Sequence, residues 1–139
     1  MTMKQYPHIF SSAMKVNSQY MHIIRFSLRI KGHATENDII NKFEKNKFTA
    51  ITHKTSSNKV FSFGRDHGYY GRIFNHTVLS IPSLHLGRYS GATTVSGFCF
   101  TPQDGNSLLS SVAAALYGLY GNDYLDYMKT FDEMLFEQI

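Results

Sequence analysis

The sequence predicts a single α+β domain over residues 1–139, with one mixed or antiparallel sheet and helices on one face. Three observations lead to this fold class. Strand-like segments alternate with helix-like ones along the chain, with no repeat or linker between them. Hydrophobic residues make up 42% of the chain, and charged residues only 17%. A length of 139 residues suits one hydrophobic core. The face without helices is expected to be free to meet a partner.

The first half of the chain predicts two strands and two helices. Tyr20–Ile30 alternates apolar with polar residues and reads as a strand. Thr35 is a candidate N-cap for a helix over Glu36–Lys45, because an acidic residue follows it three positions later. Phe48–His53 alternates again and predicts a second strand. Serine and threonine caps with a terminal glycine indicate a short helix within residues 55–68.

The second half predicts a long hairpin followed by two helices. Ile73–Leu86 is strand-like and interrupted by Pro82. Gly87–Gly91 is typical of a turn, and Thr93–Phe100 of the returning strand. The first expected helix begins at residue 106 or 107 and ends near the glycines at 118 and 121. A second helix is expected over residues 124–136.

Bulk composition narrows the cellular setting but not the function. The net charge of +4 arises from lysines and arginines scattered without a block, so it indicates no nucleic-acid-binding segment by itself. Nothing at the N-terminus resembles a signal peptide, and no apolar stretch reaches membrane-spanning length. With a single cysteine, no intramolecular disulfide can form. We therefore expect a cytoplasmic protein with no membrane contact.

Residues that carry catalytic chemistry are sparse. Cys99 falls on a predicted strand, where a buried, structural thiol is the favoured interpretation; a nucleophilic role needs a base that the sequence does not place beside it. The seven histidines show no pair at metal-ligand spacing. Phosphate-binding glycine loops and serine-hydrolase elbows are absent from the sequence. We predict no catalytic and no metal-ligating residue.

One segment suggests a function in another class. The stretch Ser96–Phe100 (SGFCF), on a strand before a helix, resembles the aromatic stripe of an RNA-recognition motif, where exposed rings stack on bases. That motif also requires a last strand after its second helix, whereas residues 123–136 predict helix. Single-stranded RNA binding, or a scaffold role, is the alternative.

Across most of its length the chain resembles the C-terminal catalytic-domain half of archaeal-type glyceraldehyde-3-phosphate dehydrogenase. The similar segments, in order, are AMKVNSQYMH (13–22), ATENDIINKFEKNKFTAIT (34–52), TSSNKVFSFGRDHG (55–68), TPQDGNSLLSSVAAAL (101–116) and MKTFDEML (128–135). In the fourth segment Pro102 stands where the family has histidine, so that similarity is partial.

The resemblance implies a substrate and oligomerisation domain that is not catalytic by itself. The family's nucleotide-binding domain and nucleophile segment have no counterpart in this chain, so NAD or NADP would come only with a nucleotide-binding-domain partner. A homo-oligomer or that partner would meet the sheet face. Gln103 and Asp104 correspond to residues bordering the cofactor, and Lys15 to a substrate-phosphate neighbour. The competing interpretations are a turn with a helix cap for Gln103 and Asp104, and a solvated lysine for Lys15.

Overall fold

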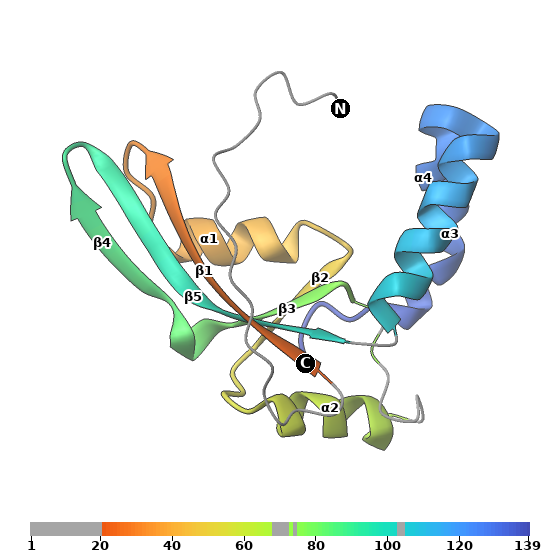
Figure 1. Cartoon of the computed structure of the whole chain (residues 1–139), viewed down its shortest axis with the longest axis horizontal. Helices are drawn as coiled ribbons and strands as arrows, with labels where there is room; N and C mark the ends of the chain where they lie inside the picture. The colour runs from red at the N-terminus through yellow and green to blue at the C-terminus, as the bar shows by residue number, and fades with distance from the viewer. Residues whose placement is uncertain (1–20, 68–72, 74, 103–104) are drawn as a thin grey trace.

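The computed structural model describes residues 21–67, 73, 75–102 and 105–139 (Figure 1). The strands are β1 (Met21–Lys31), β2 (Thr49–Thr52), β3 (Thr77–Ser80), β4 (His85–Tyr89) and β5 (Ala92–Pro102). The α-helices are α1 (Glu36–Glu44), α2 (Ser57–Asp66), α3 (Gly105–Tyr120) and α4 (Tyr124–Met128). Short 3-10 helices cover Ile81–Ser83, Gly121–Asp123 and Lys129–Met134.

All five strands belong to one mixed sheet with the order β1-β5-β3-β2, and β4 also pairs with β5. Strands β2 and β3 run parallel, joined by α2 as the crossover helix, while the other pairs are antiparallel. The long strand β5 pairs with β1 along its whole length on one edge. On its other edge β4 and then β3 follow one another. The predicted α+β class with a single mixed sheet is confirmed.

The segment Ile73–Leu86, predicted as one strand interrupted by Pro82, spans two separate strands, β3 and the beginning of β4. Pro82 lies in the 3-10 helix that separates β3 from β4, which lets the two strands pair with different parts of β5. The turn itself is tighter than predicted, because Gly87 and Tyr89 still belong to β4. Ser90 and Gly91 have φ values of 49° and 71°, the two positive φ angles that a two-residue type I′ hairpin requires.

Local caps explain where α1 begins. The Thr35 Oγ1 atom accepts the backbone N–H of Asp38 at 3.2 Å, and the Asp38 carboxylate accepts the backbone N–H of Thr35 at 2.8 Å. This reciprocal capping box satisfies two N–H groups at the helix start. The cap predicted from Thr35 is therefore confirmed. At the start of α2, Ser56 makes no such side-chain hydrogen bond.

The helices divide between the two faces of the sheet, instead of sharing the one face that was expected. Consecutive residues of β2, of β3 and of the C-terminal part of β5 are buried, so both faces of the central strands are covered. Helix α2 covers one face, where its Val60 packs with Ala50, Val78 and Phe100. Helix α1 covers the other face with Ile40 and Phe43; they pack against Ile51, Leu79 and Cys99.

The C-terminal helix is shorter than predicted. α4 ends at Met128, a 3-10 helix follows, and the last residues extend beside β2. The Ile51 N–H donates to the carbonyl of Glu137 at 2.9 Å, and the Ile139 N–H donates to the carbonyl of Ile51 at the same distance. The chain end therefore satisfies backbone groups on the outer edge of β2, which explains why helix does not continue to Phe136.

Candidate functional site

The three site residues predicted from the sequence are Lys15, Gln103 and Asp104, and all lie outside the described residues. Their proposed roles toward substrate and cofactor therefore stay predictions. The described part of the chain resumes at Gly105, where helix α3 begins.

Cys99 lies in the core between the sheet and α1. It is 5% exposed and packs with Ile51 and Leu79. Burial raises the pKa of the thiol from 9.0 to about 11, because an apolar surrounding disfavours the thiolate. A protonated, covered thiol is a poor nucleophile at neutral pH. The geometry agrees with the structural interpretation of Cys99.

The described histidines form no metal-binding cluster. Within the described part of the chain, no group of three or more histidine, cysteine or acidic residues is placed to hold a metal ion. His76 is half-buried and stacks on Phe48 with ring centroids 5.1 Å apart. Desolvation lowers the pKa of His76. His67 stacks on Phe63 at the end of α2. Both rings act as packing groups.

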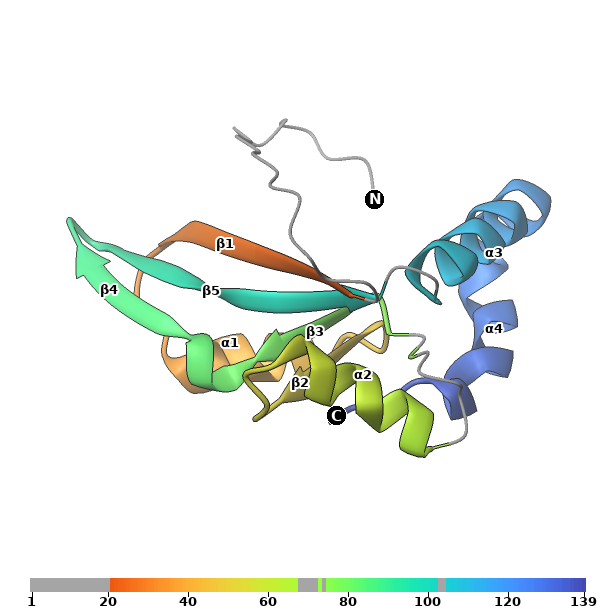
Figure 2. The ribbon, with the colours of Figure 1, turned by 60° about the horizontal axis from the view of Figure 1, so that its bottom comes forward.

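No described helix covers one face of the sheet where β1, β5 and β4 extend beyond α2 (Figures 1 and 2). We call this surface the open face. In antiparallel pairs, directly opposed residues share a face, so the strand register identifies its members. They are Arg25, Ser27, Arg29 and Lys31 of β1, Phe98, Ser96, Thr94 and Ala92 of β5, and His85, Gly87 and Tyr89 of β4.

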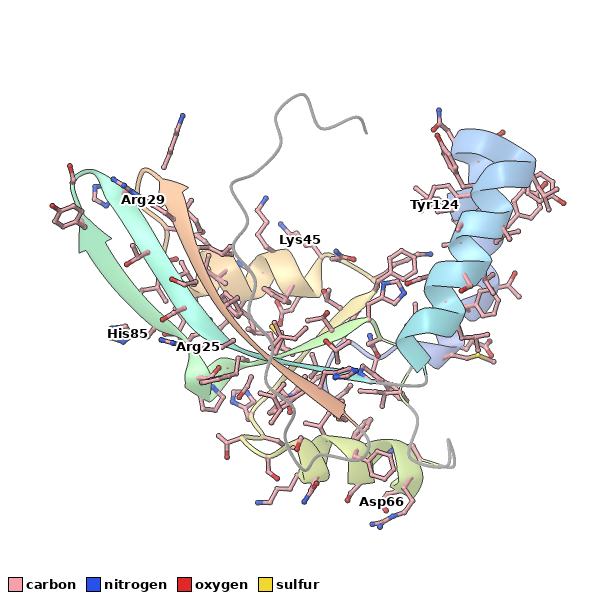
Figure 3. All side chains as sticks on the ribbon, viewed as in Figure 1. Arg25, Arg29, Lys45, Asp66, His85 and Tyr124 are labelled. Atoms are coloured by element: carbon pink, nitrogen blue, oxygen red, sulfur yellow. The ribbon has the colours of Figure 1, made fainter. Side chains whose placement is uncertain are left out.

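The open face is cationic and carries exposed rings. β1, β4 and β5 contain no aspartate or glutamate. Neither Arg25 nor Arg29 forms a salt bridge with any described residue. Figure 3 shows both arginines and His85 at the same end of the sheet. Phe98 is 42% exposed and Tyr89 is 74% exposed. The surface offers positive charge and flat aromatic area together.

A second surface is the C-terminal arm, defined as α3, Gly121–Asp123 and α4, which projects from the other end of the molecule (Figure 2). Helix α3 has 16 residues and no charged side chain. Apolar side chains of the arm are nevertheless in contact with water, among them Leu119 at 74% exposure. A helix that is apolar on several sides is normally buried. Across the described residues, no helix has the length and apolar character needed to cross a membrane.

The arm is held together and anchored at its base. Tyr117 meets Tyr124 edge-to-face at 5.6 Å, and Tyr120 stacks on Tyr127 at 4.0 Å, so α3 and α4 form one unit. After α4, the backbone of Phe136 exchanges two hydrogen bonds with the Asn75 side chain, at 2.7 and 3.0 Å. The two helices of the arm therefore pack as one unit, and the segment that follows them is tied to the sheet domain.

Sequence reasoning identified part of these surfaces. The separation of Arg25, Ser27 and Arg29 from the apolar residues of β1 was visible in the alternation. The pairing of Arg25 with Phe98 depends on the strand register and was not visible. The arm was missed, although 16 consecutive residues without a charge were a signal that could have identified it.

No protein-family model, curated protein sequence or solved structure matches this chain. The resemblance to archaeal-type glyceraldehyde-3-phosphate dehydrogenase therefore rests on the sequence segments alone. The site is accordingly described by its two exposed surfaces, the open face and the C-terminal arm.

Proposed function

We propose that this chain is a substrate and oligomerisation domain related to that of archaeal-type glyceraldehyde-3-phosphate dehydrogenase, and that it is not catalytic by itself. In this proposal a separate nucleotide-binding domain completes the enzyme. The observation that carries the proposal is the uncharged, exposed helix α3. An apolar arm of this kind is the part of a domain that another protein surface covers.

The burial of individual side chains in the arm supports a docking role. Leu109 at the base of α3 is 1% exposed and Met128 of α4 is fully buried, so the arm has an inner side that packs within the chain. Leu108, Tyr117 and Leu119 are each more than half exposed. Covering such side chains favours association by about 25 cal/mol for each Å² of apolar surface removed from water.

The presence of two exposed surfaces is consistent with the dehydrogenase form of the proposal. The chain has two open surfaces at opposite ends, the open face and the arm. A domain that contributes a pocket wall to one neighbour and an interface to another needs two such surfaces.

The residues of this chain do not fit a dinucleotide on their own. A dinucleotide cradle needs a glycine-rich turn between a strand and a helix N-terminus, and no Gly-x-Gly-x-x-Gly occurs in the sequence. The buried Cys99 thiol also does not fit the role of an acyl-forming nucleophile. The proposal therefore assigns NAD or NADP, and the reactive cysteine, to the partner domain.

Complementation tests this function. The purified chain is mixed with a nucleotide-binding domain that carries the glycine loop and the cysteine nucleophile, and NAD(P)-dependent oxidation of a phosphorylated aldehyde is measured. We expect a complex and activity from the mixture only. Leu119→Lys should raise the Kd of the complex by at least about tenfold, since burying an unpaired ammonium costs more than the corresponding ~1.4 kcal/mol.

Leu28→Lys is the matched control, because Leu28 is 55% exposed but belongs neither to the arm nor to the open face. It should leave the Kd unchanged. A complex that forms without activity would reduce the proposal to a scaffold domain that has lost the chemistry. If no complex forms, and sedimentation shows only monomers at the highest soluble concentration, the proposed function is wrong.

A further inference from the structure

The open face has a regular arrangement that the proposed function does not use. Strand pairing sets Arg25 beside Phe98, and Arg29 beside Thr94. Between these two rows, Ser27 of β1 and Ser96 of β5 lie opposite each other. The cationic and aromatic groups therefore border a central strip of small hydroxyl side chains.

The central strip of the open face carries only short side chains. A Cβ atom placed on Gly87 would lie 2.7 Å from Thr94 Oγ1, so β4 approaches β5 more closely there than a larger residue allows. The Thr94 hydroxyl donates to the Gly87 carbonyl at 3.2 Å. Ser27, Ser96 and Thr94 place three hydroxyl groups along the strip. Hydroxyl groups can donate and accept hydrogen bonds, which suits contact with sugar hydroxyls.

The spacing of the arginines favours a chain of phosphates over a single anion. Arg25 and Arg29 are four residues apart on one strand, which corresponds to about 13 Å at the usual rise per residue. That separation sets the two guanidinium groups one after the other along the strand, an arrangement that suits successive phosphates of a chain. None of the three strands carries a carboxylate that would offset the charge of the arginines.

The exposed ring of Phe98 favours a single strand over a duplex. Phe98 lies two residues before Phe100 on the same face, but Phe100 is buried under α2 and Phe98 extends past that cover. An exposed ring beside an arginine can stack on an unpaired base while the arginine contacts the backbone. In a duplex the faces of the bases are already stacked on one another.

A second copy of the chain is a poorer fit to the open face. If two open faces met, Arg25, Arg29 and Lys31 of one copy would face a surface of the same charge sign, which opposes association. Charge complementarity therefore selects a polyanion for this surface.

We infer that the open face binds single-stranded RNA, with Arg25 and Arg29 on the phosphates, Phe98 stacking on a base, and the hydroxyl groups of Ser27, Ser96 and Thr94 toward the ribose. This binding activity is independent of the dehydrogenase-type role. It gives a function to the SGFCF segment, of which only Phe98 reaches solvent as a ring on the open face.

Fluorescence anisotropy with a labelled oligouridine, over a series of salt concentrations, tests the inference. Arg25→Gln/Arg29→Gln should weaken binding by about tenfold or more and reduce the slope of log K against log salt by about 1.4, because each lost phosphate contact removes about 0.7. Phe98→Leu keeps an apolar side chain but removes the ring, and should weaken binding by at least about fivefold.

The charge-matched control is Lys42→Gln/Lys45→Gln, which removes two exposed cations from α1 and its C-cap, on the other face of the sheet. It should leave the salt slope unchanged. Circular dichroism and thermal unfolding of each variant show whether the fold is retained. If Phe98→Leu does not fold, the affinity and salt slope of the arginine variant still test the inference. Leu119→Lys should bind RNA as the wild type does, which separates this result from the docking experiment.

Three outcomes would overturn the inference: affinity for the oligouridine that is absent or insensitive to salt, an equal loss in the lysine control, or equal binding of duplex RNA. Equal binding of the matching single-stranded DNA would overturn the choice of RNA. Tighter binding to RNA than to that DNA, lost in the arginine variant and retained in the lysine control, supports it.

Discussion

The two ends of the sheet differ in how they are covered. At the closed end, β2 and β3 with the adjoining part of β5 have helices on both faces, and Ala50, Val78 and Leu79 are fully buried. At the open end, β1 and β4 flank β5, and one face has no cover among the described helices. The closed end therefore supplies most of the stability, and the open end supplies surface for binding. The following predictions test that division.

The largest expected effect is at the closed end. Leu79→Ala should lower the free energy of unfolding by about 2–5 kcal/mol, because Leu79 is 0% exposed and its removal leaves a cavity between the sheet and α1. Leu28→Ala is the comparison at the open end, where Leu28 is 55% exposed. It should change the free energy of unfolding by less than about 1 kcal/mol. Urea unfolding measures both. Equal losses would mean that the two ends share the stability evenly.

The attachment of the C-terminal segment to the closed end should come next. Asn75 is fully buried, donates to the carbonyls of Thr49 and Phe136, and accepts the N–H of Phe136. Asn75→Ala should cost about 1–3 kcal/mol, since buried backbone groups lose their partners. Hydrogen exchange should show faster exchange near Phe136 than in the wild type. Unchanged protection there would contradict the anchoring role.

Helix capping gives a smaller effect. Thr35→Ala should reduce stability by about 1 kcal/mol, because it breaks the capping box of α1. Ser56→Ala is its natural control, since Ser56 precedes α2 without a side-chain hydrogen bond and should have almost no effect. Thermal unfolding of the two variants under the same conditions makes the comparison. A larger loss from Ser56→Ala would contradict the assignment of the caps.

The smallest effect at neutral pH concerns Cys99. Its pKa rises from 9.0 to about 11 on folding, so folding favours the protonated thiol. The contribution is complete below pH 9.0 and is lost as pH rises toward about 11. The difference in free energy of unfolding between the wild type and Cys99→Ala should therefore be constant below pH 9.0. Above pH 9.0 the wild type should lose stability relative to the variant. Urea unfolding across this range measures it; a pH-independent difference would show that the thiol is not desolvated.

Local patterns predicted most of the elements. The alternation in Met21–Lys31, the Thr35 cap and the hairpin near Ser90 and Gly91 are read from neighbouring residues, and the structure places strand, helix start and turn there. Such features are decided by side-chain periodicity and by the φ and ψ preferences of a few residues, so a single sequence contains them. The extent of the last helix was not predicted, because the edge of β2 competes for that segment.

The sequence by itself determined the α+β class, the order of the elements and the scarcity of reactive groups. Tertiary structure decided which face each helix covers, which end of the sheet stays open, and that Arg25 lies beside Phe98, 73 residues away along the chain. The physical reason is that strand register and helix packing depend on contacts between distant segments, whereas periodicity and caps depend on near neighbours.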